Sequence, residues 1–159
     1  MTNGQINAVS FILSMIFYAI VVTLLISWVA AEQKNFVYAS DQNTILTSGT
    51  SIINMFVTSR GVPHNWEMNT PSVQAIGLAS STNRLSSKKV NSFLTLDYNT
   101  SRGKLGLDNT NYFFTITNMN GTLLNSSGVD SNSSTTALVF TRYAALGGNN
   151  VRVTLKIYR

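Results

Sequence analysis

The chain has 159 residues, a length that fits one domain or one domain with an appendage. It contains no cysteine, which excludes disulfide bonds, thiol catalysis and the usual structural zinc sites. The formal net charge is +5, but the basic residues are scattered from Lys34 to Arg159 instead of clustering on one face, so we expect no nucleic-acid partner.

The first element in the chain is an apolar segment from Ala8 to Ala31, and no charged side chain precedes Glu32. As a helix this segment is about 36 Å long, enough to cross a hydrocarbon core of roughly 30 Å. Its Ser and Thr side chains are small and can donate to carbonyl groups of the same helix. A secretory signal peptide is the main alternative, but it would be shorter and would carry basic residues ahead of its apolar part. We therefore expect a membrane helix.

The helical pattern continues beyond this segment as an amphipathic stripe. Between Glu32 and Arg60 there is no proline, and apolar or small residues recur with the period of one helix face. These residues are Ile45, Leu46, Gly49, Ile52, Ile53 and Phe56. We expect one helix from Ala8 to Ser59, with residues 1–59 forming a helix and stalk domain and residues 60–159 forming a head domain.

The segment after the helix could be read as a reactive site. It holds the single histidine, His64, and the acid Glu67, which together could bind a metal or act as an acid–base pair. Zinc needs more protein ligands than these, and the other acids show no ligand spacing. We expect no metal, no cofactor and no enzymatic activity.

A structural role explains the same segment better. Gly61 and Pro63 are suited to end a helix and turn the chain. Trp66 offers a large apolar surface that could fill the junction between helix and sheet. Glu67 is expected to cap a turn or to pair with Arg60. We interpret this segment as a structural elbow.

The next segment predicts a short helix, with Ser86 or Ser87 as its N-cap. Its apolar face would hold Leu85, Val90, Phe93 and Leu94. The sequence DYNTSRGKLGL, residues 97–107, then reads as one irregular helical turn.

Strand-like alternation dominates the C-terminal third of the chain. Tyr112, Phe114 and Ile116 alternate with other residues ahead of Asn120-Gly121, a strong hairpin signal. Residues 125–136 are polar and are expected to form a loop. The last two strands are joined by residues 147–150, and tyrosines on the strands are expected on the sheet surface; these are Tyr112, Tyr143 and Tyr158.

The final strand alternates cleanly between apolar residues and polar ones. Its apolar members are Val151, Val153, Leu155 and Ile157. This pattern indicates an antiparallel sheet with one covered face, and the amphipathic stripe of the helix is its natural cover. The expected fold class is α+β, with a long N-terminal helix and a small antiparallel sheet packed on its upper half.

Four Asn-x-Ser/Thr sequences lie in the head, at Asn99, Asn120, Asn125 and Asn132. Such sequences accept N-linked glycans on surfaces outside the cytoplasm, so they favour an extracellular, glycosylated head. The alternative is chance, because a chain rich in Asn, Ser and Thr produces these sequences without selection.

Two stretches carry a resemblance to a known family. The first is Gly4-Gln5 followed by INAVSFILSMIF. The second is the ordered series GVPHNWE, VQAIGLAS, LSSKKVNSFLTLDY, KLGL and YFFTI in the head. Together they make the chain similar to an archaeal pilin-like protein of the type IV filament superfamily. Two positions depart from the family pattern: no basic residue precedes Gly4, and Ser10 stands where the family has an acid.

The resemblance implies a type IV pilin-like fold and a class III signal peptide cut between Gly4 and Gln5. It implies a structural subunit of a pilus that serves adhesion at the cell surface. Its partners would be copies of itself, the membrane before assembly, the pilus assembly machinery and glycans. The residues expected in the bilayer or the filament core are Phe11, Met15, Ala19, Val22, Leu25 and Trp28.

The physical properties of the helix support the same interpretation independently of the resemblance. A helix that is apolar on every face must bury itself in lipid or against other helices, and small residues allow such helices to approach closely. The alternative is a single-pass, membrane-anchored extracytoplasmic surface or binding protein that does not polymerise.

Overall fold

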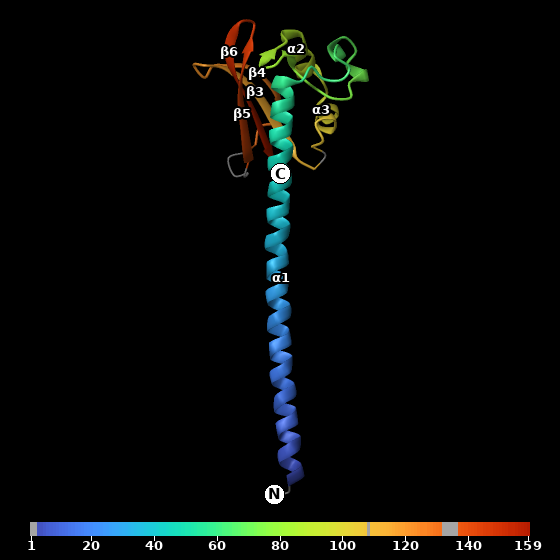
Figure 1. Cartoon of the computed structure of the whole chain (residues 1–159), viewed down its shortest axis with the longest axis vertical. Helices are drawn as coiled ribbons and strands as arrows, with labels where there is room; N and C mark the ends of the chain where they lie inside the picture. The colour runs from blue at the N-terminus through green and yellow to red at the C-terminus, as the bar shows by residue number, and fades with distance from the viewer. Residues whose placement is uncertain (1–2, 108, 132–136) are drawn as a thin grey trace. The chain divides into compact units, whose positions relative to one another are not determined.

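A computed structural model describes residues 3–107, 109–131 and 137–159 (Figure 1). The chain divides into two compact units, Met1–Asn43 and Thr44–Arg159. The first helix, α1, spans Asn3–Thr58 and belongs to both units. The sequence placed the domain boundary between residues 59 and 60, whereas the compact units divide earlier because the end of α1 is buried in the core of the second unit.

The second unit, Thr44–Arg159, is called the head from here on, so the head now includes the end of α1. It combines this part of α1 with short helices and one sheet, so the fold class is α+β. Two 3-10 helices follow α1, η1 at Trp66–Met68 and η2 at Thr70–Ser72. Helix α2 spans Ser87–Thr95 and α3 spans Tyr98–Lys104. The strands are β1 Ala79–Ser81, β2 Arg84–Leu85, β3 Asn111–Asn118, β4 Leu123–Gly128, β5 Ala137–Leu146 and β6 Asn149–Tyr158.

These strands form one six-stranded sheet in the order β1-β2-β5-β6-β3-β4. The four long strands pair antiparallel, as the sequence predicts. The expectation of a wholly antiparallel sheet is wrong, because β2 runs parallel to β5. Strands β1 and β2 are three and two residues long, too short for a period of two to show in the sequence.

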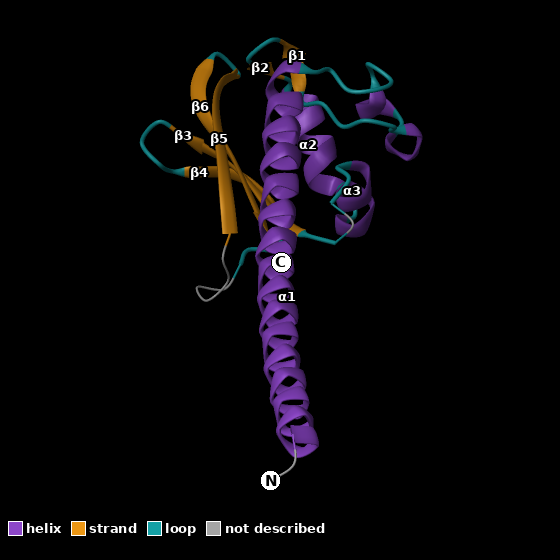
Figure 2. Ribbon diagram, turned by 60° about the horizontal axis from the view of Figure 1, so that its bottom comes forward, coloured by secondary structure: helices purple, strands orange, loops and turns teal. Residues whose placement is uncertain are grey.

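The predicted stripe on the helix is confirmed within the head. Ile52, Ile53 and Phe56 are buried, and Gly49 is buried beside Phe140 of β5. A Cβ atom on Gly49 would lie 2.1 Å from the Phe140 ring, so a larger residue there would force this ring to move. Leu46, at 43% exposed, lies at the edge of the stripe. Figure 2 shows the strands beside these last turns of α1.

The centre of the head is a cluster of aromatic rings. The ring of Phe56 lies 5.4 Å from that of Phe93 on α2 and 5.3 Å from that of Phe114 on β3. Phe93 and Phe114 pack edge to face at 5.2 Å. These are favourable geometries for aromatic pairs, and they tie helix α1, helix α2 and the sheet into one core.

The alternation on the last strand is also confirmed, since its four apolar residues are buried. The tyrosine expectation holds only in part: Tyr143 is 58% exposed, but Tyr112 and Tyr158 are buried. Tyr112 shares the inward face of β3 with Phe114. Its hydroxyl lies 2.5 Å from the Ser101 hydroxyl, and burial raises the pKa of Tyr112 above its ordinary value.

The predicted short helix is α2, and its N-cap is Ser86, whose side chain accepts from the backbone N–H of Lys89. The segment expected to form one irregular helical turn contains α3, an α-helix of seven residues. Asp97 caps α3 by accepting from the backbone N–H of Thr100 at 3.0 Å. These local hydrogen bonds satisfy amide groups that have no partner in the first turn of a helix.

Candidate functional site

The most unusual surface of the protein is the apolar part of α1. The most apolar 18 residues within Val9–Gln33 have a mean hydropathy of 2.7, and none of them is buried. Large apolar side chains are exposed around the helix, including Phe11 at 70% and Met15 at 66%. A helix of the 25 residues Val9–Gln33 is about 37 Å long and can cross a hydrocarbon core of roughly 30 Å. By length and composition, this helix is therefore a candidate membrane span; an N-terminal signal sequence passes the same test.

Two polar side chains within this segment are satisfied by the helix itself. The Thr23 hydroxyl donates to the carbonyl of Ala19 at 2.8 Å, and the Ser27 hydroxyl donates to the carbonyl of Thr23 at 2.9 Å. The predicted back-bonding is therefore confirmed at both positions. An apolar environment around them would meet no unpaired hydroxyl group, which lowers the cost of transfer out of water.

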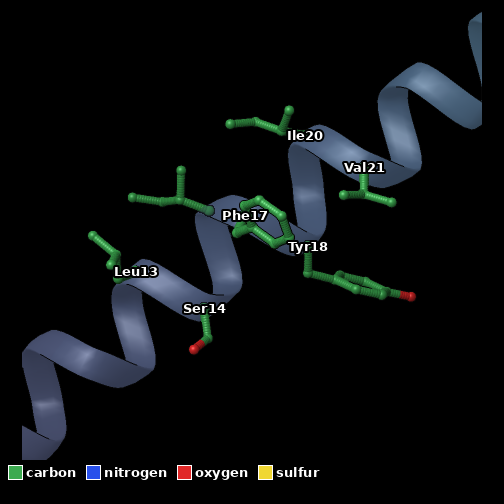
Figure 3. A pocket seen from close by; sticks show the side chains of 7 residues that line it. Leu13, Ser14, Phe17, Tyr18, Ile20 and Val21 are labelled. Atoms are coloured by element: carbon green, nitrogen blue, oxygen red, sulfur yellow. The ribbon is translucent and has the colours of Figure 1, made fainter.

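One side of this segment is shaped as a shallow groove, shown in Figure 3. Ser14 has the smallest side chain of the residues that line it. The groove is lined by Leu13, Ser14, Ile16, Phe17, Tyr18, Ile20 and Val21. It lies on a single helix without enclosing walls, so it can receive an acyl chain or a side chain of another helix but is no pocket for a soluble ligand.

The six residues expected in the bilayer or the filament core all lie on α1. Phe11, Met15, Ala19, Leu25 and Trp28 are exposed, and Val22 is half-exposed. Gly4 and Gln5, the predicted processing site, also lie on α1. Cleavage between them stays a prediction.

The backbone conformation and a backbone hydrogen bond define the elbow after α1. Gly61 has a φ of +79°, and a Cβ atom there would lie 2.7 Å from the carbonyl oxygen of Ala75 and 2.7 Å from the Trp66 ring. The Val62–Pro63 peptide bond is cis, and the N–H of Val62 donates to Ala75 at 2.8 Å. The turn thus brings the chain back against residues 74–75.

Trp66 is fully buried, and its indole N–H donates to the carbonyl of Gly77 at 3.0 Å. Burial of the whole indole, with its one donor satisfied, makes this side chain a structural anchor of the elbow. The sequence analysis selected Trp66 for its large side chain, and the core buries that side chain completely.

The sequence suggested that Glu67 caps a turn or pairs with Arg60. The pair with Arg60 does not form. The Glu67 carboxylate lies 3.1 Å from the ammonium of Lys89, and both side chains are largely buried. Arg60 instead donates to the carbonyl of Ser80 at 2.8 Å. The sequence carried no signal for Lys89, because its neighbour Lys88 has the same charge and only the position on α2 distinguishes them.

The elbow geometry does not bring its reactive-looking groups together. His64 is exposed, and its Nδ1 lies 3.4 Å from the carbonyl oxygen of Gly61. Glu67 is engaged by Lys89. Within residues 3–107, 109–131 and 137–159, no group of three His, Asp or Glu side chains is placed to hold a metal ion.

The four predicted glycosylation sites differ in accessibility. Asn99 is exposed on α3, and Asn120 is exposed in the turn between β3 and β4. Asn125 was expected in a loop, but it lies on β4 opposite Ile116 and is half-buried. Strand β4 reaches Gly128 because its backbone pairs with β3 despite polar side chains. Asn132 lies outside the described residues.

Searches of this sequence against protein-family models, curated proteins and solved structures each find no match.

Proposed function

We propose that this protein is a structural subunit of a type IV pilus-like surface filament. In this proposal the apolar part of α1 rests in the membrane before assembly and packs against the same segment of other copies afterwards. The head stays in water and is displayed outward. The single observation that carries the proposal is the 25-residue segment Val9–Gln33, whose most apolar 18 residues are exposed.

The membrane and a bundle of the same helices would both accommodate the apolar side chains of this segment. Lipid and a bundle of like helices are similarly apolar, so transfer from one to the other rests on packing. Small residues such as Ser14 and Ala19 let two helices approach, and the groove beside Ser14 offers a place for a neighbour's side chain. The order of motifs shared with archaeal pilin-like proteins supports the same proposal.

The test uses two substitutions on the apolar segment. Ala19→Trp adds bulk where close approach is needed, and Val22→Lys adds a charge that is costly in an apolar bundle. Each variant is expected to abolish filaments on the cell surface, seen by electron microscopy, while the head keeps its unfolding midpoint. Lys88→Gln, an exposed change on α2, is the matched control and should assemble normally. Normal filaments from either variant on α1 would overturn the proposal.

The alternative, in which the helix serves only as a membrane anchor, predicts a different result. Ala19→Trp would then be tolerated, because a lone helix in lipid accepts a large apolar side chain. The wild-type chain would be recovered as detergent-soluble monomers. The intact mass of protein from cells adds the processing test, since a filament subunit of this kind is expected to begin at Gln5.

A further inference from the structure

A second surface feature lies on the head. It is a hollow of about 430 Å³. The small side chain of Ala145 on β5 lines it, together with Asn83, Arg84, Met119, Tyr143 and Asn150 among others. Arg84, Ala145 and Asn150 are direct neighbours across β2, β5 and β6. The hollow, called the polar hollow below, exists because a small side chain is surrounded by large ones.

Turns hold the walls of the polar hollow in place. The Asn83 backbone accepts from the N–H of Ala145 at 2.8 Å and donates to Val57 of α1 at 2.8 Å. On another side, the Asn118 side chain accepts from the N–H groups of Asn120 and Thr122, which fixes the turn that carries Met119. The site is therefore largely preformed, as small-molecule sites usually are.

The charge at the polar hollow is positive and uncompensated. Arg84 is exposed, and neither Arg84 nor Arg152 forms an ion pair with any described residue. Arg152 does not line the hollow but lies next to it on β6, as the cross-strand neighbour of Tyr143 on one side and of Thr117 on the other. The Arg152 Nε and the Thr117 hydroxyl oxygen are buried without a hydrogen-bond partner among the described residues. A guanidinium that is partly desolvated and unpaired is stabilised by an anion at its exposed nitrogen atoms.

The same site offers neutral recognition groups. Tyr143 is 58% exposed, so its ring can cover the apolar face of a bound ring. The amides of Asn83 and Asn150 can each donate to and accept from hydroxyl groups. An aromatic face, amides and guanidinium groups together match a ligand that has an apolar ring face, hydroxyl groups and a carboxylate.

We infer that the polar hollow binds an acidic saccharide, a sugar chain that carries a uronic-acid type carboxylate. Arg84 binds the carboxylate, and Arg152 beside the hollow adds positive charge. Tyr143 packs on the sugar ring, and the two Asn amides bind its hydroxyl groups. This site gives the head a ligand on a surface or in a matrix, and it functions whether or not the chain polymerises.

A nucleic acid fits the same observations less well. A strand of phosphates requires a track of basic side chains, and its affinity rests on several such contacts. The hollow is lined by one arginine, Arg84, and of the two cations that follow on β6, Arg152 lies beside Tyr143 and Lys156 is paired with Asp130 at 2.7 Å. The chemistry of the site therefore favours one carboxylate over a row of phosphates.

The test is isothermal titration calorimetry on the full chain in a neutral detergent. The protein is produced in a host without N-glycosylation, so that Asn120, next to Met119, carries no glycan. The probes are trigalacturonate, the neutral trisaccharide maltotriose, and trithymidylate. Trigalacturonate is expected to bind, and the other two are expected to bind at least about tenfold more weakly, as loss of a charge-assisted contact implies.

Variants assign the binding to the polar hollow. Arg84→Gln and Tyr143→Ala are each expected to weaken trigalacturonate binding about tenfold, and Ala145→Leu to abolish it by filling part of the hollow. Lys88→Gln removes an equal charge elsewhere, and Val139→Leu adds bulk on the same face of β5; both should bind like wild type. The proposal is overturned if trigalacturonate does not bind, if trithymidylate binds as tightly, or if Arg84→Gln and Tyr143→Ala leave binding unchanged.

Discussion

The ammonium group of Lys89 lies 3.1 Å from a carboxylate oxygen of Glu67 inside the head, with 5% and 14% of the two side chains exposed. The same ammonium donates to the carbonyl of Arg60 at 2.6 Å and to the carbonyl of His64. It also lies 5.8 Å from the centre of the Trp66 ring. One side chain of α2 therefore holds the residues on both sides of the turn that follows α1.

Removal of this cation should destabilise the head strongly. Lys89→Met leaves the Glu67 carboxylate buried without its partner, and breaking a buried pair in this way costs about 3 kcal/mol or more. Urea unfolding followed by tryptophan fluorescence measures the loss. Lys88→Met is the matched control, because Lys88 is exposed on the same helix and should change stability little.

The double variant Glu67→Gln with Lys89→Met separates charge from packing. It removes the uncompensated carboxylate, so it should be more stable than Lys89→Met alone. If Lys89→Met unfolds at the same urea concentration as wild type, the ion pair does not support the elbow.

The backbone of the elbow gives a second prediction, on Gly61. Gly61→Ala combines an unfavourable positive φ, which costs about 1–2 kcal/mol, with a contact against the carbonyl of Ala75. Gly106→Ala is the matched control, since Gly106 has a φ of +69° but has no atom near the position of a Cβ. We expect Gly61→Ala to lower the free energy of unfolding more than Gly106→Ala. Equal losses in chemical denaturation would contradict the close packing at Gly61.

The cap of α3 predicts a dependence on pH. The backbone N–H of Thr100 is the main cause that holds the pKa of Asp97 below its ordinary value of 3.8. Because the folded pKa is the lower one, the cap stabilises the head above about pH 3.8, and this contribution is lost as the pH falls through the folded pKa. A carbon NMR titration of the Asp97 carboxyl group should give a midpoint below 3.8.

The variant Asp97→Asn completes this test. Asparagine also caps helices but does not titrate, so the variant should lose less stability than wild type on acidification. A wild-type midpoint at or above the ordinary value, or parallel losses for both proteins, would contradict the cap assignment.

The sequence predicted those parts of the fold that follow from repeating patterns. The stripe from Ile45 to Phe56, the helix that begins after Ser86 and the alternation from Val151 to Ile157 each extend over several turns or residues. Patterns of this length report which side of an element is buried, and the structure buries those sides. Both the α+β class and the long apolar helix rest on such patterns.

The features that the sequence missed depend on contacts between distant residues. Strands β1 and β2 form because Arg84 and Leu85 pair with the end of β5, although too few residues take part to leave a pattern. Lys89 pairs with Glu67, which lies far away along the chain, and the polar hollow is built from residues of three strands and two turns. A residue's neighbours in space decide such features, and spacing along the chain does not encode them.

The most direct test of the filament proposal is electron microscopy of material sheared from cells that express the chain, with gold-labelled antibody against the head. The proposal predicts fibres labelled along their whole length. Labelled protein found only in the membrane fraction as monomers, with no labelled fibre, would contradict it.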